Sequence, residues 1–190
     1  QHFNHHIHEH GYVEAPVRIR RILKEIAGSR LFEMVAPSAF PERAITSVHD
    51  VDFVNYLRRT CREIETNRYV YPYVFPIRNK TRLPKDHTIL AGYYCIDTFT
   101  PLTRHAYTAA RSAVDCTLSA AREILNGRRL AYALVRPPGH HAERRSFGGF
   151  CYFNNNAIAA QYLGAFGRVA ILDLDYHHGN GQQDIFYARK

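Results

Sequence analysis

The sequence predicts an α/β fold of three layers, in which a mainly parallel sheet is flanked by helices. An apolar run at residues 168–175, bounded by Gly167 and Gly179, is typical of a buried strand in a parallel sheet. Upstream of it, a strand expected at residues 132–135 is followed by a helix expected at residues 156–163. A strand, a helix and a strand in this order indicate a parallel connection within one sheet.

The longest predicted helix covers residues 103–125, where Ala, Val and Leu recur at helical spacing. Asn126 and Gly127 follow directly, and this pair is a helix stop signal. The strand expected at residues 132–135 would then lead into a turn that carries two adjacent histidines.

Polar side chains follow the apolar run at the point where a strand would end. Ligands of open α/β sheets bind beyond the carboxyl ends of the strands. If the extended backbone continues past Leu172, its period of two sends Asp173, Asp175 and His177 to one side. A carboxylate with an imidazole is half of a usable zinc site, because a catalytic zinc takes three protein ligands and leaves one position for water. The third ligand must come from elsewhere.

The motif Arg136-Pro-Pro-Gly-His140-His141 is the second polar cluster. Its prolines stiffen the approach and its glycine permits an unusual backbone angle, so the histidines are presented rather than packed. Asp173 and Asn180 are natural partners for their second ring nitrogens. A single histidine in a chain with twelve is more often simply half-buried. The histidines of both clusters together favour metal-assisted hydrolysis.

With these motifs the sequence resembles the histone deacetylase family, and within it the bacterial acetylpolyamine amidohydrolases and histone deacetylase-like amidohydrolases. The matching motifs stand in family order at residues 136–142, 147–155 and 171–187, with weaker similarity at residues 14–18 and 48–50. The resemblance implies the arginase/deacetylase fold. It also implies zinc-dependent hydrolysis of the amide of N-acetylated amines, with release of acetate.

The resemblance assigns a zinc site and a base to individual residues. Asp175 and His177 match zinc ligands, and His141 matches the general base that later protonates the leaving amine. His140 matches the electrostatic partner of that base, and Asp173 matches the acid beside His140.

Further roles follow from the same resemblance. Asn180, which would orient the general base, stands where several eukaryotic deacetylases carry Asp, and it favours the amidohydrolase branch. Gly149 and Phe150 match residues that line the tunnel for the acylated side chain, and Arg18 matches an arginine near the acetate-release route. Backbone carbonyls around the zinc-ligand segment correspond to a structural potassium (K+) site.

Two parts of the family's site are not found before Lys190: the third zinc ligand, an Asp, and a tyrosine that stabilises the oxyanion. We therefore expect residues 1–190 to be the N-terminal part of a single deacetylase-like catalytic domain that is incomplete at both ends. A parallel sheet ending at its catalytic strand would leave an apolar edge uncovered, and Gln1 is not an initiator. A true short product without a complete site is the alternative.

A Pro- and Tyr-rich segment at residues 69–100 resembles an insertion that, in the amidohydrolases, shapes the active-site rim and contacts a second subunit. It therefore implies a homodimer.

A polyamine carries a distal positive charge, so its enzyme should present carboxylates at the tunnel mouth. This rim offers Asp86 and Asp97 against Lys85. Acetyl-lysine and acetylpolyamines both stay open as substrates, and a non-catalytic deacetylase-like binding module is the competing class.

Composition sets broad bounds on the chain. Hydrophobic residues make up 46% and can supply a buried core. No apolar run approaches the roughly 18 residues of a membrane span and no signal peptide is visible, so a cytoplasmic protein is expected. The four cysteines lack paired spacing, which favours reduced thiols. The net charge of +8 forms no nucleic-acid motif, so nucleic-acid binding is not expected.

Overall fold

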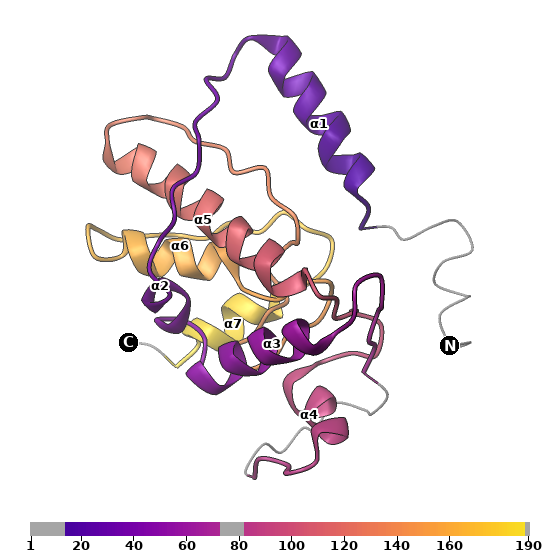
Figure 1. The fold of residues 1–190 in the computed structure, drawn as a ribbon. Helices are drawn as coiled ribbons and strands as arrows, with labels where there is room; N and C mark the ends of the chain where they lie inside the picture. The colour runs from indigo at the N-terminus through magenta and orange to yellow at the C-terminus, as the bar shows by residue number, and fades with distance from the viewer. Residues whose placement is uncertain (1–13, 73–81, 189–190) are drawn as a thin grey trace.

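The computed structural model of the protein describes residues 14–72 and 82–188 (Figure 1). The regular secondary structure of these residues is helical, and β-pairing among them is confined to isolated bridges. The helices are α1 (Pro16–Ser29), α2 (Arg43–Thr46), α3 (Val51–Glu63), α4 (His87–Tyr94), α5 (Ala106–Leu125), α6 (Asn155–Leu163) and α7 (Asn180–Phe186).

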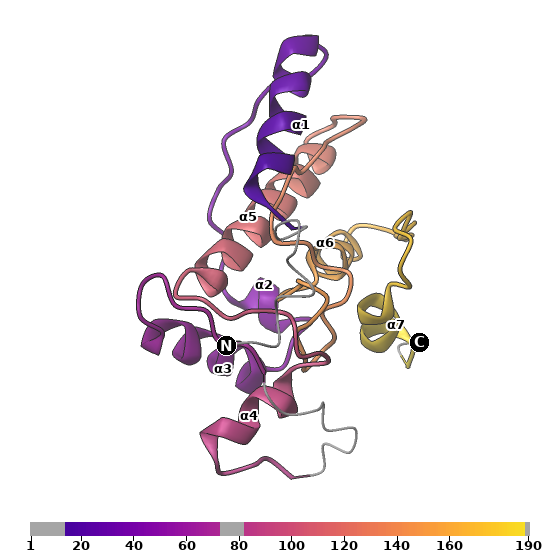
Figure 2. The same ribbon diagram turned by 90° about the vertical axis from the view of Figure 1, so that its right-hand side faces the viewer.

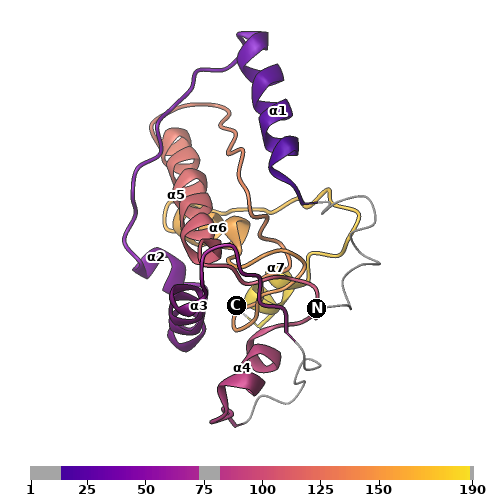
Figure 3. The same ribbon diagram turned by 45° about the vertical axis from the view of Figure 1, so that its right-hand side comes forward.

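The hydrophobic core forms around α5, which packs against α3 and α6 (Figures 1 and 3). Ala110, Val114 and Leu118 recur at intervals of four along α5 and are buried, as the helical repeat requires for one face. Phe53 and Leu57 present the matching face of α3. Removing each large apolar side chain from water contributes about 1.5–3 kcal/mol, so these faces hold the helices together.

The two predicted helices are confirmed close to their expected ends. The helix predicted at residues 103–125 is α5, and the one predicted at residues 156–163 is α6. The stop signal acts as expected, since the Asn126 N–H bonds back to the last turn and Gly127 takes a φ of 97°. Asn154 caps α6 by accepting the Ala157 N–H at 3.0 Å.

The two predicted strands are not formed by the described residues. Residues 132–135 and 168–175 lie in no ladder, and none of their apolar side chains is buried: Tyr132 is exposed by 57%, Leu172 by 82% and Leu174 by 86%. A strand is stabilised by backbone hydrogen bonds to a neighbour. No segment within residues 14–72 and 82–188 supplies that neighbour, so the expectation of a buried strand is wrong for this part of the chain.

Helix α1 stands apart from the other helices in Figure 1 and extends past the end of α5 in Figure 2, and none of its residues is buried. Its apolar side chains Ile19, Leu23 and Ile26 form one wall of a hydrophobic groove of about 490 Å³. Residues 31–35 and 130–134 also line it, so one of the expected strands lies along this groove.

The segment at residues 69–100 is described in part, because residues 73–81 lie outside the described residues. Its ends are joined by a bridge in which the N–H groups of Val70 and Leu102 donate to each other's carbonyls at 2.9 and 2.7 Å. Tyr93, Tyr94 and Cys95 near its C-terminal end are buried in the core. The segment therefore supplies core residues, and its expected roles in an active-site rim and in a homodimer contact stay predictions.

None of the helices in the described ranges is both long enough and apolar enough to cross a bilayer.

Candidate active site

The paired histidines lie with their rings in contact, at a centroid separation of 4.0 Å. His141 Nδ1 lies 2.6 Å from Asn180 Oδ1, and Asn180 Nδ2 donates to Glu143 Oε1 at 3.0 Å. Because a carboxamide oxygen can only accept, Nδ1 carries the proton and donates it. The Nε2 atom of a neutral His141 ring is then left with a lone pair that can accept a proton.

His140 is tied to the second polar block through Asp173. Its Nδ1 lies 3.0 Å from Asp173 Oδ2, which also accepts from Gln182 Nε2 at 2.7 Å. Burial by itself raises the pKa of Asp173, but hydrogen bonds from the Asp175 N–H, from Gln182 and from His140 outweigh it, so the net pKa is lowered. The carboxylate is therefore charged and can stabilise a positive charge on His140.

Asp175 and His177 point to a common site. His177 Nδ1 lies 3.0 Å from Asp175 Oδ1, and the His177 N–H donates to the same oxygen at 2.8 Å. That backbone hydrogen bond is the main reason why the pKa of Asp175 is lowered. The His177 ring lies 5.7 Å from the His141 ring, and His140 Nε2 is 3.9 Å from Asp175 Oδ1. The structure thus brings both predicted polar blocks together.

An imidazole nitrogen and a carboxylate oxygen that converge in this way fit two positions of a zinc site. Both side chains are accessible, with 48% of Asp175 and 68% of His177 exposed. Among residues 14–72 and 82–188, no group of three or more His, Cys, Asp and Glu side chains is arranged to hold a metal ion. Within the described residues, Asp175 and His177 are therefore two candidate donors, and they do not form a complete metal site by themselves.

A backbone hydrogen bond holds the start of α7 against the turn that carries the paired histidines. The Gly181 N–H, in the first turn of α7, donates to the His140 carbonyl at 2.9 Å. A Cβ at this position would lie 2.3 Å from the Ala142 carbonyl oxygen and 2.5 Å from that of His140. Only glycine allows this approach, which explains the glycine after Asn180.

The turn that carries the paired histidines rests on a buried histidine. His49 is 1% exposed; its Nε2 accepts the Asn154 N–H at 2.9 Å, so its Nδ1 donates to the Glu143 carbonyl at 2.9 Å. Asn154 Nδ2 in turn donates to the Ala142 carbonyl at 3.0 Å. Burial lowers the pKa of His49 from 6.5 to about 4. This neutral ring is not among the predicted site residues, although it lies in the weaker family similarity at residues 48–50.

The expected tunnel residues Gly149 and Phe150 stand in left-handed backbone conformations, with φ of 54° and 66°. A Cβ on Gly149 would lie 2.2 Å from His141 Cδ2, so this glycine is in direct contact with the ring of the expected base. The next residue, Cys151, is buried, and burial raises the pKa of its thiol to about 12. It is a packing residue rather than a nucleophile.

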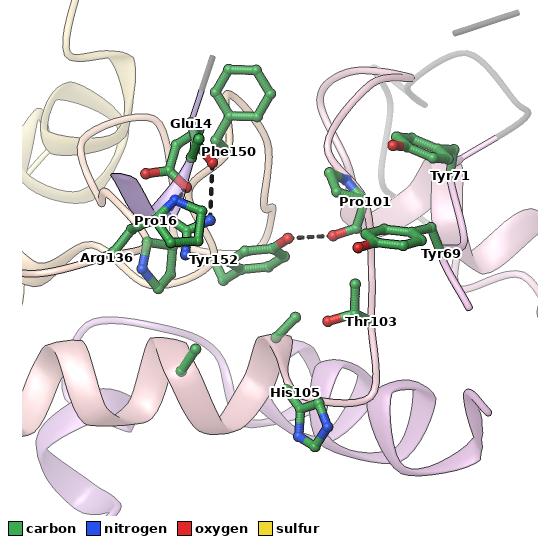
Figure 4. Close-up of a pocket in the computed structure, with 14 residues that line it drawn as sticks. Glu14, Pro16, Tyr69, Tyr71, Pro101, Thr103, His105, Arg136, Phe150 and Tyr152 are labelled. Atoms are coloured by element: carbon green, nitrogen blue, oxygen red, sulfur yellow. Dashed lines mark hydrogen bonds and ion pairs between the residues drawn. The ribbon is translucent and has the colours of Figure 1, made fainter. Parts of the chain in front are cut away.

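A cavity of about 680 Å³ borders the expected tunnel residue Phe150, which lies at one end, while Tyr69 and Tyr71 lie at the other (Figure 4). Arg136 lines it and pairs with Glu14 at 2.6 Å. None of the paired histidines or the two metal donors lines this cavity, so it is separate from the candidate reaction site. Arg18, the expected acetate-route residue, is exposed on α1 and lines neither of the two cavities.

Asp97 does not act as the free rim carboxylate that the sequence suggested. Its side chain turns inward and accepts hydrogen bonds from the N–H of Phe99, Thr100 and Gly149, and from the Thr100 hydroxyl. An Asp followed by a threonine three residues later is a local hydrogen-bonding pattern that could have been read from the sequence. Gln182 hydrogen-bonds to Asp173, and Glu143 hydrogen-bonds to Asn180. No local sequence pattern predicts either of these contacts.

Comparison with known proteins places this geometry in context. A model of the histone deacetylase domain matches residues 12–190. Acetylpolyamine amidohydrolase 2 of Pseudomonas aeruginosa is 42% identical over 183 residues, which cover 93% of this chain and 53% of that protein. Acetylpolyamine amidohydrolase of Mycoplana ramosa is 38% identical over 182 residues, again with 93% and 53% covered. The chain thus spans about half the length of these relatives.

Solved structures agree with the predicted fold class. The crystal structure of acetylpolyamine aminohydrolase from Burkholderia pseudomallei superposes with a TM-score of 0.84 at 37% identity, covering 93% of this chain and 52% of that one. The HD domain of HDA15 gives a TM-score of 0.73 at 30% identity, covering 93% and 44%. The arginase/deacetylase fold expected from the sequence is therefore confirmed.

Proposed function

The chain belongs to the histone deacetylase family, as its motifs predicted, and from this premise we propose that the whole protein is a zinc-dependent amidohydrolase that releases acetate from N-acetylated amines. The observation that carries the proposal is the environment of His141. Its Nδ1 is held by Asn180 while its Nε2 is left to accept a proton, beside the converging donors Asp175 and His177. This arrangement meets the geometric need of a general base that works next to a metal.

The residues of this chain have distinct roles in the proposed reaction. Asp175 and His177, with a third ligand, would hold a zinc ion, which would act as a Lewis acid toward the amide carbonyl and lower the pKa of a water. His141 takes the proton of the attacking water at Nε2 and later delivers it to the leaving amine. Asn180 keeps the opposite ring nitrogen protonated, so the ring cannot change tautomer between the two transfers.

His140 and the tunnel loop complete this assignment. His140 lies against the base, and the charged Asp173 behind it offsets the positive charge that develops on the paired rings. Gly149 and Phe150 line the path of the aliphatic chain that carries the acetamide, and they keep bulk water from the reacting carbonyl.

The proposed substrates are acetylpolyamines or acetyl-lysine. The names of the relatives favour acetylpolyamines, whereas the inward turn of Asp97 removes one of the two rim carboxylates that would attract a distal ammonium. The roles of Arg18, of a structural potassium ion and of a homodimer, and the cytoplasmic location, stay predictions.

The test uses the full-length protein loaded with zinc. We expect acetate release from N-acetylputrescine, from an acetyl-lysine peptide or from both, and loss of that release after chelation with restoration by added zinc. A preparation that holds zinc and is inert on both substrates would contradict the proposal and favour the deacetylase-like binding module.

Replacing the metal donor Asp175 with alanine is expected to weaken zinc binding in the full-length protein by roughly 100-fold or more, since one of three protein ligands is lost. The measurement is competition with a chelator of known affinity, followed by zinc analysis of the protein. Asp52→Ala is the matched control, because this carboxylate on α3 is 63% exposed and lies outside the site. Equal zinc affinities in both variants would remove Asp175 from the metal site.

Replacing Gly149 with alanine is expected to lower kcat/KM by roughly 100-fold, because the new Cβ would displace the His141 ring, and a shift of about 1 Å can have this effect. Gly127→Ala is the matched control. It adds a Cβ at a φ of 97° with nothing within 4 Å, so it introduces backbone strain without touching the site. Both variants should lose some thermal stability, and only Gly149→Ala should lose activity. Equal activities would show that the ring does not depend on this contact.

A further inference from the structure

Two side chains of the segment before α5 reach the backbone of the tunnel loop. Asp97 Oδ2 accepts the Gly149 N–H at 2.6 Å, and Thr100 Oγ1 accepts the Phe150 N–H at 3.0 Å. The Thr100 hydroxyl also donates to Asp97 Oδ2 at 2.8 Å. The rim segment and the tunnel wall are therefore joined by a continuous set of hydrogen bonds.

The chemistry of this link requires a carboxylate. Asp97 Oδ1 accepts the N–H groups of Phe99 and Thr100 at 2.9 and 2.7 Å, while Oδ2 accepts the two bonds described above. Four N–H and O–H donors thus face one side chain, besides the weaker Cys95 thiol at 3.9 Å from Oδ1, and only a group with four acceptor sites and no donor satisfies these four. A carboxamide in its place would leave at least one donor facing an NH2 group.

The link acts on a backbone that is strained. Phe150 has a side chain and a φ of 66°, a conformation that costs about 1–2 kcal/mol for residues other than glycine. Thr100 is fully buried, so its hydrogen bond to the Phe150 N–H is shielded from water and costly to lose. The Phe99 ring packs edge-on against the Phe150 ring at 5.4 Å and extends the contact to the side chain.

Movement of this loop would reach the expected base directly. The Gly149 Cα leaves no space for a Cβ against His141, so a displaced Gly149 backbone must push the imidazole or withdraw from it. Residues 97–100 are distant in sequence from both, and they connect to them through the bonds to Gly149 and Phe150.

We propose that Asp97 and Thr100 are positioning residues that fix the tunnel wall at Gly149 and Phe150 and thereby set which acetylated amine the tunnel accepts. The claim about substrate selectivity rests on the proposed function. The claim that these residues fix the backbone of the loop is independent of it.

Thr100→Val and Thr100→Ser in the full-length, zinc-loaded protein form the matched pair. Valine has the shape of threonine but no hydroxyl, so the Phe150 N–H loses its acceptor, whereas serine keeps it. Amide hydrogen exchange at Gly149 and Phe150 should be roughly tenfold faster or more in Thr100→Val and near wild type in Thr100→Ser. This readout needs no activity.

The second readout is selectivity between N-acetylputrescine and N-acetylcadaverine, which differ by one methylene group. Thr100→Val should raise KM and change the ratio of the two kcat/KM values by roughly tenfold, and Thr100→Ser should restore the wild-type ratio.

Wild-type rates of amide exchange in Thr100→Val would overturn the proposal, and so would an equal loss of kcat/KM on both amines with an unchanged ratio. A wild-type protein inert on both amines and on an acetyl-lysine peptide would count against the proposed function, and the exchange rates would then decide the positioning role. If Thr100→Val does not fold, Asp97→Asn takes its place, and its amide exchange rates and its ratio of kcat/KM values are compared with those of the wild type.

Discussion

Replacing His141 with alanine in the full-length protein is expected to lower kcat by roughly 10²- to 10⁴-fold, the range typical of a lost general base. The reason is the free Nε2 of a ring whose Nδ1 donates to Asn180. Zinc content and thermal stability should change little, because His141 is neither of the two proposed metal donors and is only half-buried.

The control for this experiment is His105→Ala. His105 is exposed at the start of α5 and touches none of the paired histidines or metal donors, so its removal should leave kcat within about twofold. A His141→Ala variant that keeps wild-type kcat would assign the proton transfers to another residue, and His140 would be the next to test.

His49 is expected to make the protein acid-sensitive. Its pKa is about 4 when folded and 6.5 when exposed, so the unfolded state binds more protons between these values. Its contribution to the free energy of unfolding is complete above about pH 6.5, falls with pH through this window, and is smaller by roughly 3 kcal/mol below about pH 4.

The measurement is urea denaturation at about pH 7 and about pH 4.5 for wild type and His49→Ala. At neutral pH the variant should be less stable by roughly 2–4 kcal/mol, since it leaves the Asn154 N–H without an acceptor and opens space in the core. The difference between the two proteins should narrow on acidification. His105→Ala should follow the wild-type curve, and a constant difference at both pH values would show that His49 does not titrate in this window.

The helices could be predicted because their signals are local. The apolar repeat of α5 and the stop at Asn126 and Gly127 depend on residues within a few turns, and both are found where expected. The strand at residues 168–175 depends on a neighbour, and its apolar composition alone could not show that the described residues lack one.

The same distinction applies to the candidate site. Asp173 and Asn180 could be proposed as partners of the paired histidines from residue types, and the resemblance implied that Asn180 holds His141. The contacts of His49 and Thr100 could not be predicted in this way. Each accepts a hydrogen bond from a backbone N–H about 50 or more residues away, and nothing in the local sequence marks that contact.

The unpaired segments at residues 130–134 and 168–174 have a consequence for how this part of the chain behaves in solution. They carry exposed apolar side chains such as Leu130 and Leu172 beside backbone groups that lie in no ladder with other described residues. Such an edge is a template for adding a further strand from any chain that offers one. Where no partner strand covers it, we expect self-association that grows with protein concentration, and charged or proline substitutions on the outward face would oppose it.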